Sequence, residues 1–149
     1  MASILISILL LTYYIILWDS YVERHAAAFG KGARDGGLLA ASDSLVLSGG
    51  YPENWPEDPS KVLMLGLART PNILDPEKVS ALEWVPYATA KRALGTDQEV
   101  YISVEDADGI RYAQFGTQAN STETASETSR TAMLNGTVVH VRVQIYEGN

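Results

Sequence analysis

The first eighteen residues, MASILISILLLTYYIILW (Met1–Trp18), contain no charged side chain, whereas the remainder of the 149-residue chain carries every Asp, Glu, Lys and Arg. As an α-helix this stretch would span about 27 Å at roughly 1.5 Å per residue. That length nearly matches the hydrocarbon core of a bilayer, which is about 30 Å thick. Tyr13, Tyr14 and Trp18 stand at its far end, where aromatic rings favour the membrane interface. We therefore expect an apolar N-terminal helix suited to a membrane.

Three interpretations of this stretch stay open. A cleaved secretory signal would have a basic n-region and a small-residue cleavage site, and neither is visible before or within the run. A simple transmembrane anchor needs only the apolar run itself. A processed chain, whose basic leader has already been removed, would explain why the first positive residues, Arg24, Lys31 and Arg34, follow the run, since the leader would have set the orientation in the membrane.

A helical pattern continues beyond Asp19. Val22, Ala26, Phe29 and Ala33 recur at spacings of four, three and four residues, which place them on one helix face. Later apolar residues resume this stripe, so we predict one long helix over residues 1–47, apolar at first and then amphipathic. A helix of this length must pack against other chains or stand exposed.

Four glycines interrupt the predicted helix: Gly30, Gly32, Gly36 and Gly37. Each interior glycine costs roughly 1 kcal/mol relative to alanine. The glycines are candidates for a kink or for close helix–helix packing, because Gly32 and Gly36 have small-xxx-small spacing. A plain loop between two helices explains them equally well.

Residues 48–149 are predicted to form an extracytoplasmic head. Ser48-Gly-Gly-Tyr-Pro52 ends the long helix, since glycine supplies left-handed geometry and proline cannot continue a helix. Trp55 is expected to pack against the core of the head. Asp75 and Pro76 begin a short helix as N-cap and first helical residue. Pro86 separates it from a second helical piece that ends near residue 95.

The strands of the head are read from alternation of apolar and polar residues. We predict strands over Val62–Ala68, Glu99–Glu105, Ile110–Phe115 and Thr137–Tyr146. The fold class is therefore α+β: a long N-terminal apolar/amphipathic α-helix followed by a small head with an antiparallel β-sheet and one or two short helices.

Residues 117–130 (TQANSTETASETSR) contain only two apolar side chains and are predicted to be a flexible Ser/Thr-rich loop. The loop holds the glycosylation pattern Asn120-Ser-Thr, and a second pattern begins at Asn135. Both asparagines are candidate N-glycosylation sites, which suits a glycoprotein at the cell surface. Asn135-Gly136 also makes a favourable hairpin turn.

Composition argues against several classes of function. A net charge of −7 repels phosphate backbones, so no nucleic-acid partner is expected. The chain has no cysteine, and His25 and His140 are too isolated to suggest a metal centre. Asp106-Ala-Asp-Gly109 superficially resembles a calcium loop but lacks the final ligand, so a hairpin turn is preferred. Because no catalytic constellation or phosphate loop stands out, we expect no enzyme, no cofactor and no metal.

The order of these features resembles that of the archaeal type IV pilins and pilin-like proteins, which have a class III signal peptide. The stretch Ser48-Gly-Gly-Tyr-Pro-Glu-Asn-Trp55 is similar to the Gly-Tyr-Pro-x-Asn-Trp motif that follows the helix in some of them. Asn72-Ile-Leu-Asp-Pro-Glu-Lys-Val-Ser-Ala-Leu82 and Met133-Leu-Asn-Gly-Thr-Val-Val139 are also similar to recurring segments of this group. The chain departs from the family pattern in having no basic leader before the apolar run and no Glu near the start of the helix.

The resemblance implies a structural subunit of an extracellular, pilus-like filament, anchored in the membrane before assembly, and adhesion is a candidate role of the assembled filament. Its partners would be other copies of itself, the membrane and surface glycans. The alternative is a membrane-anchored minor pilin-like or accessory binding module that does not polymerise alone. The polymerisation helix would use Ile4, Leu5, Ile8, Leu9, Leu11, Ile15, Trp18, Val22, Ala26 and Phe29.

Overall fold

The computed structural model describes residues 36–120 and 123–148. The chain separates into two compact units, Met1–Arg34 and Asp35–Asn149, and only the second falls within the described residues. We call this second unit the folded unit. The apolar stretch of residues 1–18 and most of the predicted polymerisation helix therefore lie outside the described residues.

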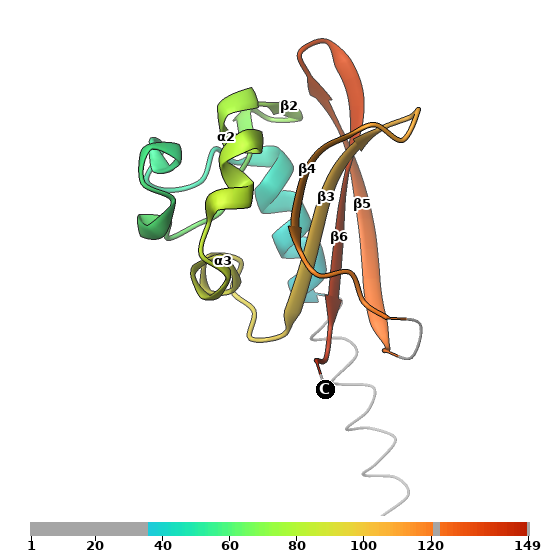
Figure 1. The fold of residues 1–149 in the computed structure, drawn as a ribbon. Helices are drawn as coiled ribbons and strands as arrows, with labels where there is room; N and C mark the ends of the chain where they lie inside the picture. Colours follow the sequence, from blue (N-terminus) through green and yellow to red (C-terminus); the bar gives the residue numbers. More distant parts are fainter. Residues whose placement is uncertain (1–35, 121–122, 149) are drawn as a thin grey trace, which may run out of the picture. The chain divides into compact units, whose positions relative to one another are not determined.

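The folded unit is built on a six-stranded sheet with the order β1-β2-β5-β6-β3-β4. Every neighbouring pair is antiparallel except β2 and β5, which run parallel. The two longest strands form a hairpin at the centre, and β3 and β4 form a second hairpin beside it (Figure 1). The strands are β1 Ala68–Thr70, β2 Ile73–Leu74, β3 Glu99–Asp106, β4 Arg111–Gly116, β5 Ala125–Leu134 and β6 Thr137–Tyr146.

Three short α-helices lie within the described residues: residues 36–47, α2 Pro76–Ala81 and α3 Tyr87–Ala93. The 3-10 turns are η1 Trp55–Glu57, η2 Pro59–Lys61 and η3 Leu82–Trp84. Figure 1 shows the helices gathered on one face of the sheet, which we call the inner face. Apolar residues of β3 and β6 point to this face and form one core with the helices. The inward residues of these two strands are Val100, Ile102, Val104, Val139, Val141, Val143 and Ile145.

The helix of residues 36–47 is a core element of the folded unit. Leu38, Ala41, Leu45 and Val46 recur at helical spacing and are all buried. None of the helices that the structure describes is long and apolar enough to cross a membrane.

The predicted fold class is wrong. The expectation was a long N-terminal helix followed by a small head with an antiparallel sheet and one or two short helices, whereas the described residues form a mixed six-stranded sheet with three short helices. Within residues 36–120 and 123–148 no long N-terminal helix is present, and helical residues 36–47 pack into the folded unit. A single-sequence pattern missed β2 because a two-residue strand is too short to show alternation.

The parallel pairing of β2 depends on contacts from distant parts of the chain. Asn72 adopts φ 63° and donates its backbone N–H to the Val46 carbonyl at 2.8 Å. Its own carbonyl accepts from the Met133 N–H, also at 2.8 Å. The end of the helix and β5 therefore hold the β1–β2 turn between them, and this arrangement sets the direction of β2.

Two further local predictions are wrong. Residues 125–130, expected as part of a loop, form the first half of β5. The whole of β5 pairs with β6. Val62–Ala68 is mostly irregular, with one bridge between Tyr51 and Met64 before β1 begins at Ala68. Both errors arose because backbone pairing partners, not side-chain hydrophobicity, determine these segments.

Other local predictions are confirmed. The Asp75 carboxylate caps α2 by accepting from the Glu77 backbone N–H at 3.0 Å. The helix resumes as α3 after Pro86. The β5–β6 turn has φ 51° at Asn135 and 82° at Gly136, as expected for an Asn-Gly hairpin.

Candidate functional site

The predicted polymerisation residues lie outside the described residues: Ile4, Leu5, Ile8, Leu9, Leu11, Ile15, Trp18, Val22, Ala26 and Phe29. Gly30 and Gly32 lie there too. Gly36 and Gly37 belong to the helix of residues 36–47, so at these two positions the chain is helical and not a loop. A Cβ atom at either glycine would meet nothing within 4 Å. Close packing inside the described part of the chain therefore does not require glycine at these positions.

The candidate glycosylation sites are both at the surface. Asn120 is exposed in the connection between β4 and β5, and Asn135 is exposed in the β5–β6 turn. Either side chain is accessible to a modifying enzyme in the folded unit, and Asn135 also serves the turn.

Residues 48–55 connect separate parts of the folded unit. Trp55 is buried, as predicted, and its indole N–H donates to the carbonyls of Gly66 at 3.1 Å and Gly49 at 3.3 Å. The buried Lys78 ammonium donates to the same Gly49 carbonyl at 2.8 Å. A Cβ at Gly66 would lie 2.3 Å from the Ser48 carbonyl oxygen, so the two chain segments cross in direct backbone contact. These residues hold the fold and do not line a site.

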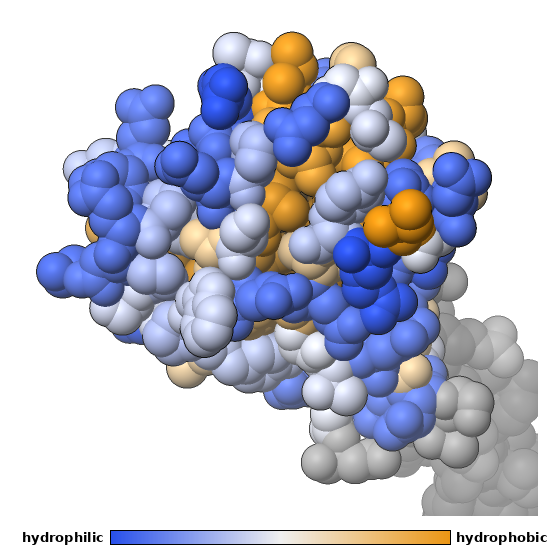
Figure 2. Space-filling view, turned by 45° about the horizontal axis from the view of Figure 1, so that its top comes forward, coloured by the Kyte–Doolittle hydropathy of each residue, from blue (hydrophilic) through white to orange (hydrophobic). Residues whose placement is uncertain are grey.

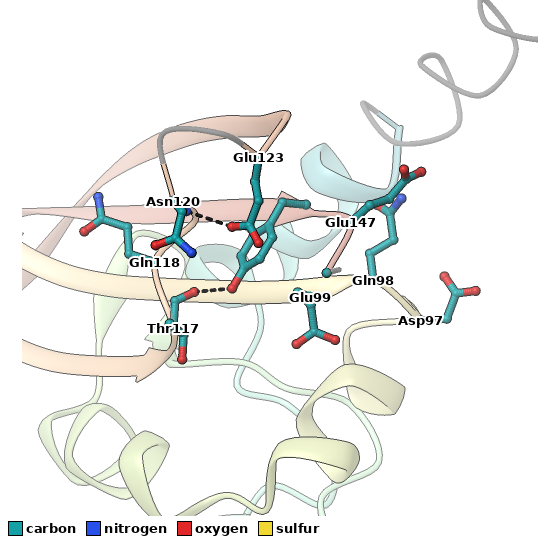
Figure 3. A pocket seen from close by; sticks show the side chains of 10 residues that line it. Asp97, Gln98, Glu99, Thr117, Gln118, Asn120, Glu123 and Glu147 are labelled. Atoms are coloured by element: carbon teal, nitrogen blue, oxygen red, sulfur yellow. Dashed lines mark hydrogen bonds between the residues drawn. The ribbon is translucent and has the colours of Figure 1, made fainter.

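A polar hollow of about 760 Å³ lies at the end of the sheet near the C-terminal residues (Figure 3). It lies between the start of β3, the end of β6 and the connection from β4 to β5. Four acidic side chains are among its lining residues. The complete lining is Asp97, Gln98, Glu99, Thr117, Gln118, Asn120, Glu123, Tyr146, Glu147 and Gly148.

The β4–β5 connection forms one wall of this hollow because of the strand order. β4 is at the sheet edge and β5 lies beyond β3 and β6, so the connection has to pass these two strands, and its bonds to outward-pointing residues of β6 place it on the face opposite the core. The Thr117 carbonyl accepts from the Tyr146 hydroxyl at 2.7 Å, and the Ala119 N–H donates to the Gln144 side chain at 3.4 Å. The connection therefore covers Tyr146 and Gln144. Both side chains are buried, although the alternation of β6 places them on the face opposite the core.

Glu99 is the most heavily engaged carboxylate of the hollow. It accepts from Lys91 Nζ at 2.9 Å and from the Tyr87 hydroxyl at 2.7 Å. The hydrogen bond from Lys91, followed by that from Tyr87, lowers the pKa of Glu99. Burial raises the pKa of Tyr87 to about 12, and burial also raises the pKa of Tyr146. The two phenols are therefore protonated at neutral pH and act as hydrogen-bond donors.

The chemistry of the hollow is consequently that of an open acidic surface. Among the described residues no group of three or more His, Cys, Asp or Glu side chains is arranged to hold a metal ion. His140 is not part of the hollow; it is exposed on the outer face of β6, with Nδ1 3.5 Å from Thr131 Oγ1. That position agrees with its prediction as an ordinary outer-face residue of the last strand.

A row of apolar side chains lies at the opposite end of the sheet. Ile73, Met133 and Val138 are neighbours across β2, β5 and β6, and each remains about half exposed. We call these three residues the tip row. Figure 2, which turns this end toward the viewer, shows hydrophobic residues at the surface among charged ones. Exposed neighbouring apolar residues of this kind are typical of contact surfaces.

Trp84 is the most exposed large apolar side chain in the described part of the chain, at 78%. It lies in η3 between buried Leu82 and Val85 and lines a shallow groove. The pattern of α2 contains a signal for it, because Val79, Leu82 and Val85 share the buried face and Trp84 falls off that face. The tip row has no comparable signal, since it depends on the unpredicted strand β2.

No protein-family model, curated protein or solved structure matches this chain.

Proposed function

We propose that the chain is the structural subunit of an extracellular filament of the archaeal type IV pilus-like kind. The uncharged stretch Met1–Trp18 would bring copies together, and the folded unit would form the outer surface. The observation that carries this proposal is the division of the chain after Arg34, which assigns the uncharged stretch and the acidic folded unit to different parts of the chain.

The core of the folded unit supports this division of roles. Leu45, Leu67, Leu82 and Val143 are fully buried by other residues of the described part of the chain. The core that the structure describes is formed by residues of the folded unit. Burial of that stretch in a membrane, and later against other copies of itself, would remove its apolar surface from water in both states.

The charges of the folded unit suit an outer surface. Every charge of the chain follows Trp18, and the excess of acidic residues favours solubility and opposes lateral collapse of fibres. The tip row provides apolar contact area for a neighbouring unit within one fibre. These features support a polymer whose subunits touch at selected points.

Electron microscopy of material sheared from the source cells, with mass spectrometry of its main protein, tests the proposal. Thin fibres made mainly of this chain are expected. The variant Ile8→Asp should abolish fibres while leaving the folded unit intact, since a charge in the apolar stretch costs about 2.5–3.5 kcal/mol in a membrane-like environment. The matched variant Ile8→Val should assemble normally. Normal fibres from Ile8→Asp would rule out assembly through this stretch.

A second candidate function is a membrane-anchored accessory module that binds a ligand and does not polymerise alone. The groove beside Trp84 favours this alternative, because an exposed indole in a groove is a binding feature. Abundance separates the two candidates. A filament subunit dominates the sheared fraction, whereas an accessory module stays with the membranes as a minor component.

A further inference from the structure

The groove beside Trp84 is formed by two separate elements of the folded unit. η1 supplies one side, and α2 with the following η3 supplies the other. Its volume is about 520 Å³, and its lining is Pro56, Glu57, Pro76, Glu77, Ser80, Ala81 and Trp84. The prolines, the alanine and the indole make a largely apolar wall whose shape is held by rigid side chains.

The charges of the groove are all negative. Glu57 enters from η1 and Glu77 from the first turn of α2, and no basic residue lines the groove. Within residues 36–120 and 123–148 neither carboxylate is part of an ion pair; Glu57 accepts a hydrogen bond from the Asn54 amide at 3.2 Å. The groove therefore combines an uncovered π-face with two uncompensated carboxylates.

This combination selects for a cation. A guanidinium or ammonium group is attracted to the face of an indole, and carboxylates form charge-assisted hydrogen bonds with the same group. A neutral ligand such as a sugar would partly desolvate both carboxylates without supplying a counter-charge, which is unfavourable. The apolar wall in turn suits an extended backbone that lies along the groove.

A second copy of the folded unit is a poor source of that cation. Most of the basic side chains in the described residues are already in ion pairs, namely Lys61, Arg69, Lys91, Arg111, Arg130 and Arg142. Lys78 is buried, which leaves Arg92. The surplus of carboxylates in the folded unit favours a partner of opposite charge.

We propose that this groove binds an extended peptide segment of another protein through one arginine or lysine side chain, whose charged group lies over the Trp84 ring between the Glu57 and Glu77 carboxylates. Such a site goes beyond assembly of a filament. It would give the surface of the protein a specific affinity for basic proteins whether or not the chain polymerises.

Fluorescence anisotropy with the full-length protein in non-ionic detergent tests this site. The probe is a labelled, capped peptide with the sequence Ala-Pro-Arg-Pro-Ala, and its control carries citrulline, a neutral isostere, in place of arginine. The arginine peptide should bind about tenfold more tightly than the citrulline peptide, because the charge contributes to both the cation–π contact and the hydrogen bonds.

Variants locate the binding to the groove. Trp84→Ala should weaken binding of the arginine peptide about tenfold, and Trp84→Phe should weaken it less, since Trp gives the strongest cation–π contact. Glu57→Gln and Glu77→Gln should each weaken it roughly threefold and reduce its dependence on salt. Leu63→Ala removes exposed apolar surface outside the lining of the groove and should leave the affinity unchanged. Unchanged melting temperatures establish that each variant is folded.

Several results would overturn the proposal: equal affinity for the arginine and citrulline peptides, full binding by Trp84→Ala, or no binding of the arginine peptide by the wild-type protein at about 1 mM, the weak limit of specific recognition. Tighter, Trp84-dependent binding of a neutral oligosaccharide such as mannotetraose would also overturn it and assign the groove to glycans. Each of these results is independent of whether fibres form, so the filament proposal is tested separately.

Discussion

Replacing Leu45 with alanine should destabilise the folded unit much more than the same replacement at Leu47. Both residues lie in the last turn of the helix of residues 36–47. The Leu45 side chain is 0% exposed within the core, whereas Leu47 is 47% exposed. The two variants therefore test the packing of this helix, because both replace leucine with alanine in the same helical turn and differ in the burial of the leucine.

The magnitudes follow from burial. Removing a fully buried leucine side chain costs about 2–5 kcal/mol, because transfer free energy is lost and a cavity is left. At Leu47 about half of the side chain stays in water, so the expected loss is about 1 kcal/mol or less. For a unit of this size 1 kcal/mol corresponds to roughly 3–4 °C, so Leu45→Ala should lower the melting temperature by about 6–20 °C.

Urea and thermal unfolding of the full-length protein in detergent, followed through the near-ultraviolet signal of buried Trp55, provide the measurement. The dependence of the unfolding free energy on urea should be the same in both variants, because each change lowers stability without altering the unfolded chain. Small and equal losses at Leu45 and Leu47 would show that the helix does not pack into the core, and the described architecture would be refuted.

Three other predictions concern single positions. Gly66→Ala should prevent folding or cost more than about 3 kcal/mol, because the new methyl group would lie 2.3 Å from a backbone oxygen; a soluble variant with the wild-type urea midpoint would contradict the crossing of segments seen there. Glu99→Gln should lower stability at pH 7. The hydrogen bond from Lys91 is the main cause of the lowered pKa of Glu99 in the folded protein, so the charged carboxylate stabilises the fold at pH values above 4.5, the ordinary pKa of this group. That contribution is lost as pH falls through the lowered pKa, so the urea midpoints of variant and wild type should converge as the Glu99 carboxylate becomes protonated; a deficit independent of pH would exclude this origin. Glycans at Asn120 and Asn135 should raise the intact mass of protein purified from its source, and Asn→Gln variants should remove each increment; an unmodified mass would reject both sites.

Local signals predicted a large part of the folded unit. The N-cap Asp75, the helix break at Pro86, and the turns at Gly109 and Asn135 depend on interactions among a few consecutive residues, and the structure confirms them. β3 and β6 were predictable because an apolar residue recurs at every second position along each of them and points to the core. A single sequence is enough to predict these features, because each depends on backbone sterics or on the burial of one face of a strand.

Prediction from local patterns failed where a strand is determined by pairing with a distant segment. The first half of β5 carries Ser, Thr, Glu and Arg in place of an apolar face, and it is a strand because β6 offers a full backbone ladder. Arg130 of β5 faces inward and forms an ion pair with Asp43 in the helix of residues 36–47. The two side chains are 2.8 Å apart and 87 positions apart in the sequence. No pattern within either segment contains this information.

The sequence by itself determined where charge is absent, where helices and hairpins begin and end, and which faces of the central strands are buried, because these are properties of neighbouring residues. Only the tertiary structure decided that residues 36–47 belong to the folded unit, that β2 joins β5 in parallel, and that Trp84 stands uncovered beside two carboxylates. These features depend on which distant segments meet, and the free energy of such meetings comes from contacts that no local stretch of the chain contains.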